Sequence, residues 1–130
     1  MSIKVAIADD YPPIRRAIRS CIESNTDWEV CGEAEDGEAA VDLVRQLNPD
    51  LLVLDLSMPR MNGIDAARKI AAIAPKTRMI LFTGYSCEQL LNDAKRAGIR
   101  AVLSKEHDDA LEHLVAVLKQ AADTDAPLAA

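Results

Sequence analysis

The sequence is poor in aromatic residues, which make up only 3% of its 130 positions. Because apolar residues still reach 49%, the core must be built mainly from aliphatic side chains and alanine. A chain of this length is most simply one domain with a core of its own. We find neither an apolar run of membrane-spanning length nor a charged-then-apolar leader. We therefore expect a soluble, cytoplasmic protein without membrane association.

An excess of positive charge is also missing. The chain has 15 Lys and Arg residues against 21 Asp and Glu residues, a formal net charge of −6. An acidic balance of this kind argues against non-specific binding to nucleic acid or to an anionic membrane surface. We expect no direct nucleic-acid binding by this domain.

Paired metal-binding or disulfide motifs are absent as well. Cys21, Cys31 and Cys87 are an odd set without C-x-x-C spacing, so we expect reduced, partly buried thiols. His107 and His113 are six positions apart and do not share one face of a helix, which argues against a zinc site.

What the sequence does contain is a fivefold alternation of short apolar runs and longer amphipathic segments. The predicted strands are Ile3–Ala8, Glu29–Glu33, Leu51–Leu54, Met79–Phe82 and Ala101–Leu103. Apolar residues at helical spacing predict helices over 14–22, 40–47, 64–74, 90–97 and 111–118. Five strand–helix units with short connections imply a parallel sheet with helices on both faces. Such sheets bind ligands beyond the carboxyl ends of their strands.

The ends of the predicted strands carry complementary polar groups. Asp9 and Asp10 follow the first strand and Asp55 the third, while Thr83 follows the fourth and Lys105 the fifth. Three close carboxylates need a cation, and oxygen ligands of this kind suit Mg²⁺. A metal and a lysine that face an aspartate form a site for a phosphoryl group, which the aspartate can carry covalently. Each residue alone is more often a turn, a cap or a solvated end, so the prediction rests on their combination.

With the stretch D-L-S-M-P-R-M-N-G from Asp55 to Gly63, these residues resemble the receiver domain of bacterial two-component response regulators. The stretches I-K-V-A-I-A-D-D-Y-P and V-C-G-E-A-E-D-G-E-A-A resemble the NarL/LuxR-type subgroup. The resemblance implies a CheY-like, three-layer α/β/α flavodoxin-like fold, (βα)5, with a five-stranded parallel sheet in the order 2-1-3-4-5. It also implies a receiver domain over residues 1–120. The small and polar residues over 121–130 predict a flexible tail or the start of a linker.

The resemblance assigns a role to each residue of the site. Asp55 would be the phosphoacceptor, Lys105 would pair with the phosphoryl group, and Thr83 would hydrogen-bond one of its oxygens. The implied Mg²⁺ ligands are Asp10, Asp9 (directly or through water), Asp55 and the backbone carbonyl of Ser57. Met58, Pro59 and Gly63 would shape the turn that presents the phosphoacceptor.

The implied function is Mg²⁺-dependent acceptance of a phosphoryl group from a sensor histidine kinase or phosphotransfer protein. Phosphorylation would shift a two-state equilibrium and thereby control a partner or output in a phosphorelay, and it could promote a homodimer. Such a domain is no enzyme beyond catalysing its own phosphorylation and dephosphorylation.

Three positions depart from the receiver pattern or modulate it. Val102 stands where receivers commonly carry an aromatic switch residue, and Glu106 stands where a cis proline is common. Tyr85, two positions after Thr83, is expected either to cover the site and prolong the phosphorylated state or to contact a partner.

Three alternatives remain at this point. A phosphorylation-independent pseudo-receiver, an interaction module, is favoured only by Val102. A nucleotide- or flavin-type cofactor domain would need a Gly-rich or hydroxyl-rich phosphate loop, which A-D-D-Y-P-P does not provide. A haloacid-dehalogenase-like phosphatase would need a second aspartate where this chain has Ser57.

Overall fold

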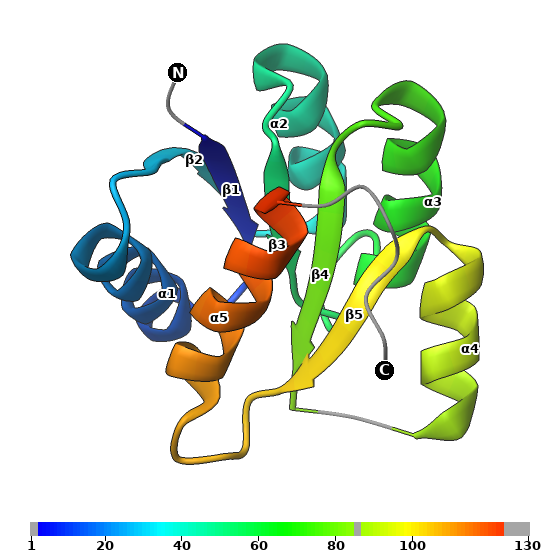
Figure 1. The fold of residues 1–130 in the computed structure, drawn as a ribbon. Coiled ribbons are helices and arrows are strands. Elements are labelled where there is room, and N and C mark those ends of the chain that lie inside the picture. The colour runs from blue at the N-terminus through cyan, green and yellow to red at the C-terminus, as the bar shows by residue number, and fades with distance from the viewer. Residues whose placement is uncertain (1–2, 85–86, 124–130) are drawn as a thin grey trace.

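The computed structural model describes residues 3–84 and 87–123, in which five strands alternate with five helices. The strands are β1 (Lys4–Ala8), β2 (Glu29–Ala34), β3 (Leu51–Leu54), β4 (Arg78–Thr83) and β5 (Ile99–Ser104). The helices are α1 (Pro12–Asn25), α2 (Gly37–Leu47), α3 (Gly63–Ile73), α4 (Glu88–Arg96) and α5 (Ala110–Asp123). All strand pairs are parallel, and their order is β2-β1-β3-β4-β5 (Figure 1). The predicted fold class and strand order are confirmed.

Helices cover both faces of the sheet, as Figure 1 shows: α1 and α5 lie on one face and α2, α3 and α4 on the other. Side chains of a strand point alternately to the two faces. In β1, Val5 and Ile7 accordingly pack with α1 and α5, while Ala6 and Ala8 pack with α2, α3 and α4. All four residues are fully buried, which explains why β1 is apolar at every position.

Most elements extend beyond the ranges that the apolar pattern predicts, and β5 and α5 show why. β5 spans Ile99–Ser104 rather than Ala101–Leu103, because half-buried Arg100 and Ser104 belong to this edge strand without being apolar. α5 continues to Asp123, and its residue Ala121 is fully buried in the core beneath α1 and α5. The last helical turn therefore overlaps the predicted tail of 121–130, of which residues 124–130 lie outside the described part.

The three cysteines are free thiols, half-buried at Cys21 and Cys31 and exposed at Cys87. Burial raises the pKa of the Cys21 and Cys31 thiols, so both stay protonated and behave as small apolar side chains. Within residues 3–84 and 87–123, no helix combines the length and the apolar character needed to cross a membrane.

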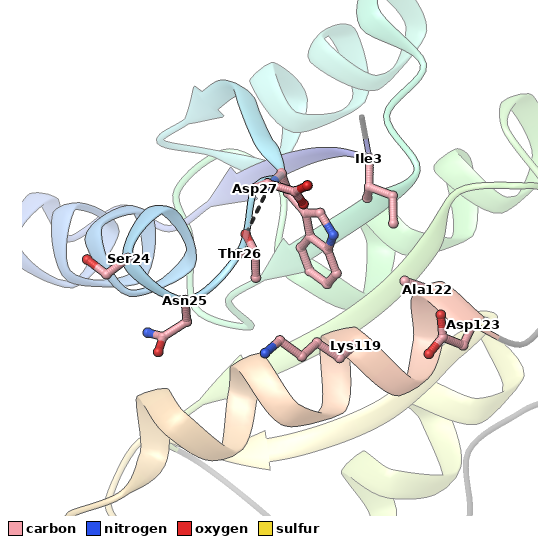
Figure 2. A pocket seen from close by; sticks show the side chains of 9 residues that line it. Ile3, Ser24, Asn25, Thr26, Asp27, Lys119, Ala122 and Asp123 are labelled. Carbon is pink, nitrogen blue, oxygen red and sulfur yellow. Dashed lines mark hydrogen bonds between the residues drawn. The ribbon is translucent and has the colours of Figure 1, made fainter. Parts of the chain in front are cut away.

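A hollow of about 620 Å³ lies between the end of α1, the segment that joins α1 to β2, and the end of α5 (Figure 2). Its lining includes Trp28, Lys119 and Asp123, and the Trp28 amide donates a hydrogen bond to the Thr26 hydroxyl beside it. This hollow is at the amino ends of the strands. It is therefore at the opposite edge of the sheet from the acidic residues that follow β1 and β3.

Candidate functional site

The carboxylates that follow β1 and β3 lie side by side at the point where the strand order reverses. Ala8 pairs with Leu54 in the sheet, so Asp9 and Asp55 leave two neighbouring strands at the same level. The Asp55 amide donates to the Ala8 carbonyl over 2.9 Å, which fixes this register. One carboxylate oxygen from each of Asp9, Asp10 and Asp55 lies within 4.8 Å of the others. The structure thus brings together the three acids that the sequence selected.

Lys105 directly follows the carboxyl end of β5, and its side chain reaches these acids. Its ammonium Nζ lies 2.7 Å from Asp9 Oδ2 and 3.3 Å from Asp55 Oδ1. The Lys105 amide donates to the Thr83 carbonyl over 2.9 Å, which holds the start of the β5–α5 loop against the end of β4. The ammonium therefore lies between two carboxylates that would otherwise repel each other.

The three acids differ in their exposure to solvent. Asp9 is 1% exposed and Asp55 6%, whereas Asp10 lies at the surface. Burial raises the pKa of Asp55; the Lys105 ammonium works against this shift and the Asp9 carboxylate adds to it. The cluster combines three carboxyl groups with one ammonium, so its formal charges leave an excess of negative charge. The donor set, which is all oxygen and carries excess negative charge, fits a hard divalent cation such as Mg²⁺.

The loop between β3 and α3 packs closely against the backbone of Asp55. The Leu56 amide donates to Asp55 Oδ1 over 2.8 Å, and the Gly63 amide donates to the Leu56 carbonyl over 2.8 Å. A Cβ atom at Gly63 would lie 2.2 Å from the Asp55 carbonyl oxygen. The side chain of Asn62 caps α3 by accepting from the Asp65 amide. A glycine at position 63 therefore allows α3 to begin directly against the strand end that carries Asp55.

Comparison with known proteins identifies the family of this chain. Residues 5–119 match the family model described as the response regulator receiver domain. The chain belongs to this family. Receiver domains bind Mg²⁺ at an acidic pocket and interact with histidine kinases or phosphotransfer proteins, and phosphorylation on aspartate is consistent with the family.

Individual relatives agree with this assignment. The chain is 37% identical over 124 residues to the transcriptional regulatory protein YxjL of Bacillus subtilis, a match that covers 95% of this chain and 56% of that protein. It is 33% identical over 118 residues to the nitrate/nitrite response regulator protein NarL of Escherichia coli, covering 91% and 54% respectively. This receiver therefore spans about half the length of these curated relatives.

A solved receiver structure has the same arrangement. The response regulator domain of Thermotoga maritima CheB superposes with a TM-score of 0.90 at 30% identity, covering 97% of this chain and all of that one. The CheY-like, flavodoxin-like architecture and a place near the NarL/LuxR group are thus shown, the latter by the match to NarL.

The remaining predicted positions surround this receiver's acidic cluster at different depths. Thr83 is 2% exposed at the end of β4, and Ser57 lies at the surface two residues after Asp55. Val102 is half-buried, pairs with Leu81 of β4 and packs against the core beneath α2, α3 and α4. Tyr85 lies outside the described residues, so its effect on the phosphorylated state stays a prediction.

The segment after Lys105 contains no proline and adopts an exposed turn. The Glu106 amide donates to the Ser104 hydroxyl over 3.1 Å. None of the described peptide bonds is cis.

One residue of the receiver site did not emerge from the sequence. Arg15, in the first turn of α1, donates from Nη1 to the Asp9 carbonyl oxygen over 2.7 Å. A signal was present, because Arg15 lies one helical turn after Tyr11, and its side chain can reach back toward the start of the helix. An exposed arginine in a helix is common, however, and spacing alone does not select it.

Proposed function

We propose that Asp55 accepts a phosphoryl group from the phosphohistidine of a sensor histidine kinase or phosphotransfer protein, in a Mg²⁺-dependent reaction. The observation that carries this proposal is the cluster itself. The buried Asp55 carboxylate lies 3.3 Å from the Lys105 ammonium. One of its oxygens also lies within 4.8 Å of a carboxylate oxygen from each of two further acids. An isolated cluster of acids would be unfavourable, whereas a cluster that takes a divalent cation and then a phosphoryl dianion is balanced.

The carboxylate of Asp55 is oriented for attack by one of its two oxygens. Oδ1 accepts from the Leu56 amide and lies beside the Lys105 ammonium. We assign the attack to Oδ2, which forms the new bond to phosphorus while the bond between phosphorus and the donor's imidazole nitrogen breaks. The electron pair of that bond leaves with the imidazole.

The acids of the cluster and the backbone carbonyl of Ser57 would hold the Mg²⁺ ion. When bound, this ion supplies positive charge that offsets the charge of the transferred phosphoryl oxygens. The Lys105 ammonium, 3.3 Å from Asp55 Oδ1, offers a second positive charge and would pair with the phosphoryl group. The Thr83 hydroxyl would hydrogen-bond one phosphoryl oxygen and couple the site to the loop after β4.

Phosphorylation would then bias a two-state equilibrium that controls a partner or an output, with a homodimer as one form of the altered state. Because Val102 has no ring to rotate, this receiver would switch through its backbone loops and Thr83 rather than through an aromatic side chain. In this proposal the domain acts in the cytoplasm, catalyses no reaction other than its own phosphorylation and dephosphorylation, and leaves any output to other segments or partners.

The test is incubation with acetyl phosphate in Mg²⁺ and in EDTA, followed by intact-mass measurement. We expect one added phosphoryl group in Mg²⁺ only, and none in the Asp55→Asn variant. Asp42→Asn is the matched control, because Asp42 is an acid on α2 whose side chain is 65% exposed and pairs with Arg45 of the same helix. Absence of labelling with this donor and with several phosphorylated kinases would favour the pseudo-receiver instead. Labelling of Asp55→Asn to the wild-type level would exclude Asp55 as the acceptor.

A further inference from the structure

The side chain of Arg15 joins the turn that carries the two leading acids to the neighbouring strand. Its Nη1 donates to the Asp9 carbonyl oxygen over 2.7 Å, and its Nε donates to Glu33 Oε1 over 3.0 Å. Only 17% of the Arg15 side chain is exposed, and its hydrogen bond to the Asp9 carbonyl oxygen is partly buried. Glu33 belongs to β2, which pairs with β1 in the sheet. The guanidinium therefore ties the end of β1 to both α1 and β2.

The carbonyl that Arg15 holds belongs to the peptide between Asp9 and Asp10. A peptide unit is planar, so the direction of this oxygen fixes the plane from which the Asp10 backbone continues. The other polar atoms of Asp9 are also held: its amide donates to the Ala34 carbonyl over 3.0 Å, and its Oδ1 accepts from the Tyr11 amide over 2.9 Å.

Asp10 depends more strongly on this peptide plane than Asp9 does. The Asp9 carboxylate has a direct partner in the Lys105 ammonium, whereas Asp10 is exposed at the surface. A charge-assisted hydrogen bond to the intervening carbonyl is a strong restraint on the plane. Without it, the Asp10 carboxylate would sample positions outside the cluster of three acids.

We propose that Arg15 is a positioning residue for the divalent cation: it fixes the peptide between Asp9 and Asp10 and is itself oriented by Glu33. This inference rests on the proposed function, because it concerns the same acidic cluster. Arg15 acts through the backbone and contacts neither the cation nor the phosphoryl group. It is distinct from Lys105, whose ammonium lies among the carboxylates themselves.

Electrostatics and positioning predict opposite effects when Arg15 is replaced. A guanidinium near the acids repels a cation, so loss of its charge alone would strengthen Mg²⁺ binding. Loss of the restraint on the Asp9 carbonyl would weaken Mg²⁺ binding, because the ligands are less preorganised. The sign of the change in affinity therefore distinguishes the two effects.

The experiment is a calorimetric Mg²⁺ titration of the folded wild-type chain and of Arg15→Gln, Arg15→Lys and Arg19→Gln. Arg19 is the matched control: it lies on the same helix and also pairs with Glu33, but it makes no contact with Asp9. For Arg15→Gln we expect affinity to fall roughly tenfold, the lower end of the loss seen when residues that orient metal ligands are removed. Arg15→Lys should recover part of the loss through a single hydrogen bond, and Arg19→Gln should bind as tightly as wild type or slightly tighter.

Circular dichroism before titration checks that each variant is folded. Glu33→Gln is a second variant that tests the same positioning role. Because it keeps the arginine but weakens its orienting partner, Glu33→Gln should lower the affinity in the same direction and by less. Unchanged or tighter binding by Arg15→Gln, with a wild type that binds Mg²⁺ and is phosphorylated, would overturn the positioning role while leaving the proposed function intact. A wild type that binds no Mg²⁺ would overturn both.

Discussion

Replacement of Gly63 by alanine should disturb both the fold and the proposed phosphorylation site. The added Cβ would lie 2.2 Å from the Asp55 carbonyl oxygen, about 1.2 Å short of the 3.4 Å at which ordinary contact begins. Further backbone atoms are close, at 3.0 Å for the Asp55 carbonyl carbon and 3.1 Å for the Leu56 Cα. Side-chain rotation cannot relieve this clash, because the obstacles are backbone atoms. The end of β3 or the start of α3 must move.

Overpacking in a well-packed interior typically costs about 1–3 kcal/mol, and a backbone obstacle places Gly63→Ala at the upper end, about 3 kcal/mol. For a domain of this size, roughly 3–5 °C is lost per kcal/mol, so the midpoint of thermal unfolding should fall by about 9–15 °C. The variant should still fold, because domains typically have about 5–15 kcal/mol of stability. Its phosphorylation by acetyl phosphate should be slower, since the displaced carbonyl belongs to Asp55.

The assay is thermal and urea unfolding followed by circular dichroism, together with the phosphorylation rate. Gly84→Ala is the control for stability, because a Cβ there meets no atom of the described residues within 4 Å. We expect this control to change the free energy of unfolding by no more than about 0.5 kcal/mol. If Gly63→Ala stays within about 1 kcal/mol of wild type and is phosphorylated at the normal rate, the close approach to Asp55 does not constrain this loop.

Three further predictions concern single side chains. In the metal-free protein Asp55→Asn should raise the free energy of unfolding at neutral pH, because burial raises the pKa of Asp55 above its ordinary value of 3.8 and its ionisation opposes folding. Wild type regains stability as the pH falls through that raised pKa, so the difference in the free energy of unfolding between the two proteins should shrink in acid. A difference that stays constant would refute the prediction. Lys105→Gln should lower the free energy of unfolding by about 2 kcal/mol in EDTA by leaving Asp9 without its ammonium, and Mg²⁺ should restore part of the loss; a loss that Mg²⁺ does not reduce would contradict it. Asp36→Ala should lower the free energy of unfolding in urea by about 1 kcal/mol, because Asp36 caps α2 through a 2.7 Å hydrogen bond from the Ala39 amide. Phosphorylation should be unchanged. A variant as stable as wild type would count against the cap.

The elements that could be predicted best are those whose whole length is apolar. β3 was predicted with the bounds Leu51–Leu54 that the structure has, because it is buried throughout and flanked by polar residues. β5 was predicted too short because it is the edge strand, where the half-buried residues Arg100 and Ser104 interrupt the apolar run. Hydrophobic periodicity reports burial, and an edge strand is only partly buried.

The grouping of the site residues could also be predicted, although their contacts could not. Parallel strands place their carboxyl ends at one edge, so Asp9, Asp55 and Lys105 could be expected to lie near one another. The sequence offered no means to decide which leading acid Lys105 would contact. The structure pairs it with Asp9 across 96 positions of the chain.

The alternation of strands and helices, the apolar character of the central strands and the polar groups that follow them can all be predicted from the sequence alone. These features depend on residue type and on spacing along a short stretch of chain. The three-dimensional structure was needed to show that Asp9 is buried while Asp10 is exposed, that Gly63 lies against the Asp55 backbone, and that Arg15 donates to the Asp9 carbonyl. The physical reason is that burial and hydrogen bonding at the site depend on how α1, β2 and the loop before α3 pack around the ends of β1 and β3. Segments distant in the chain set that packing.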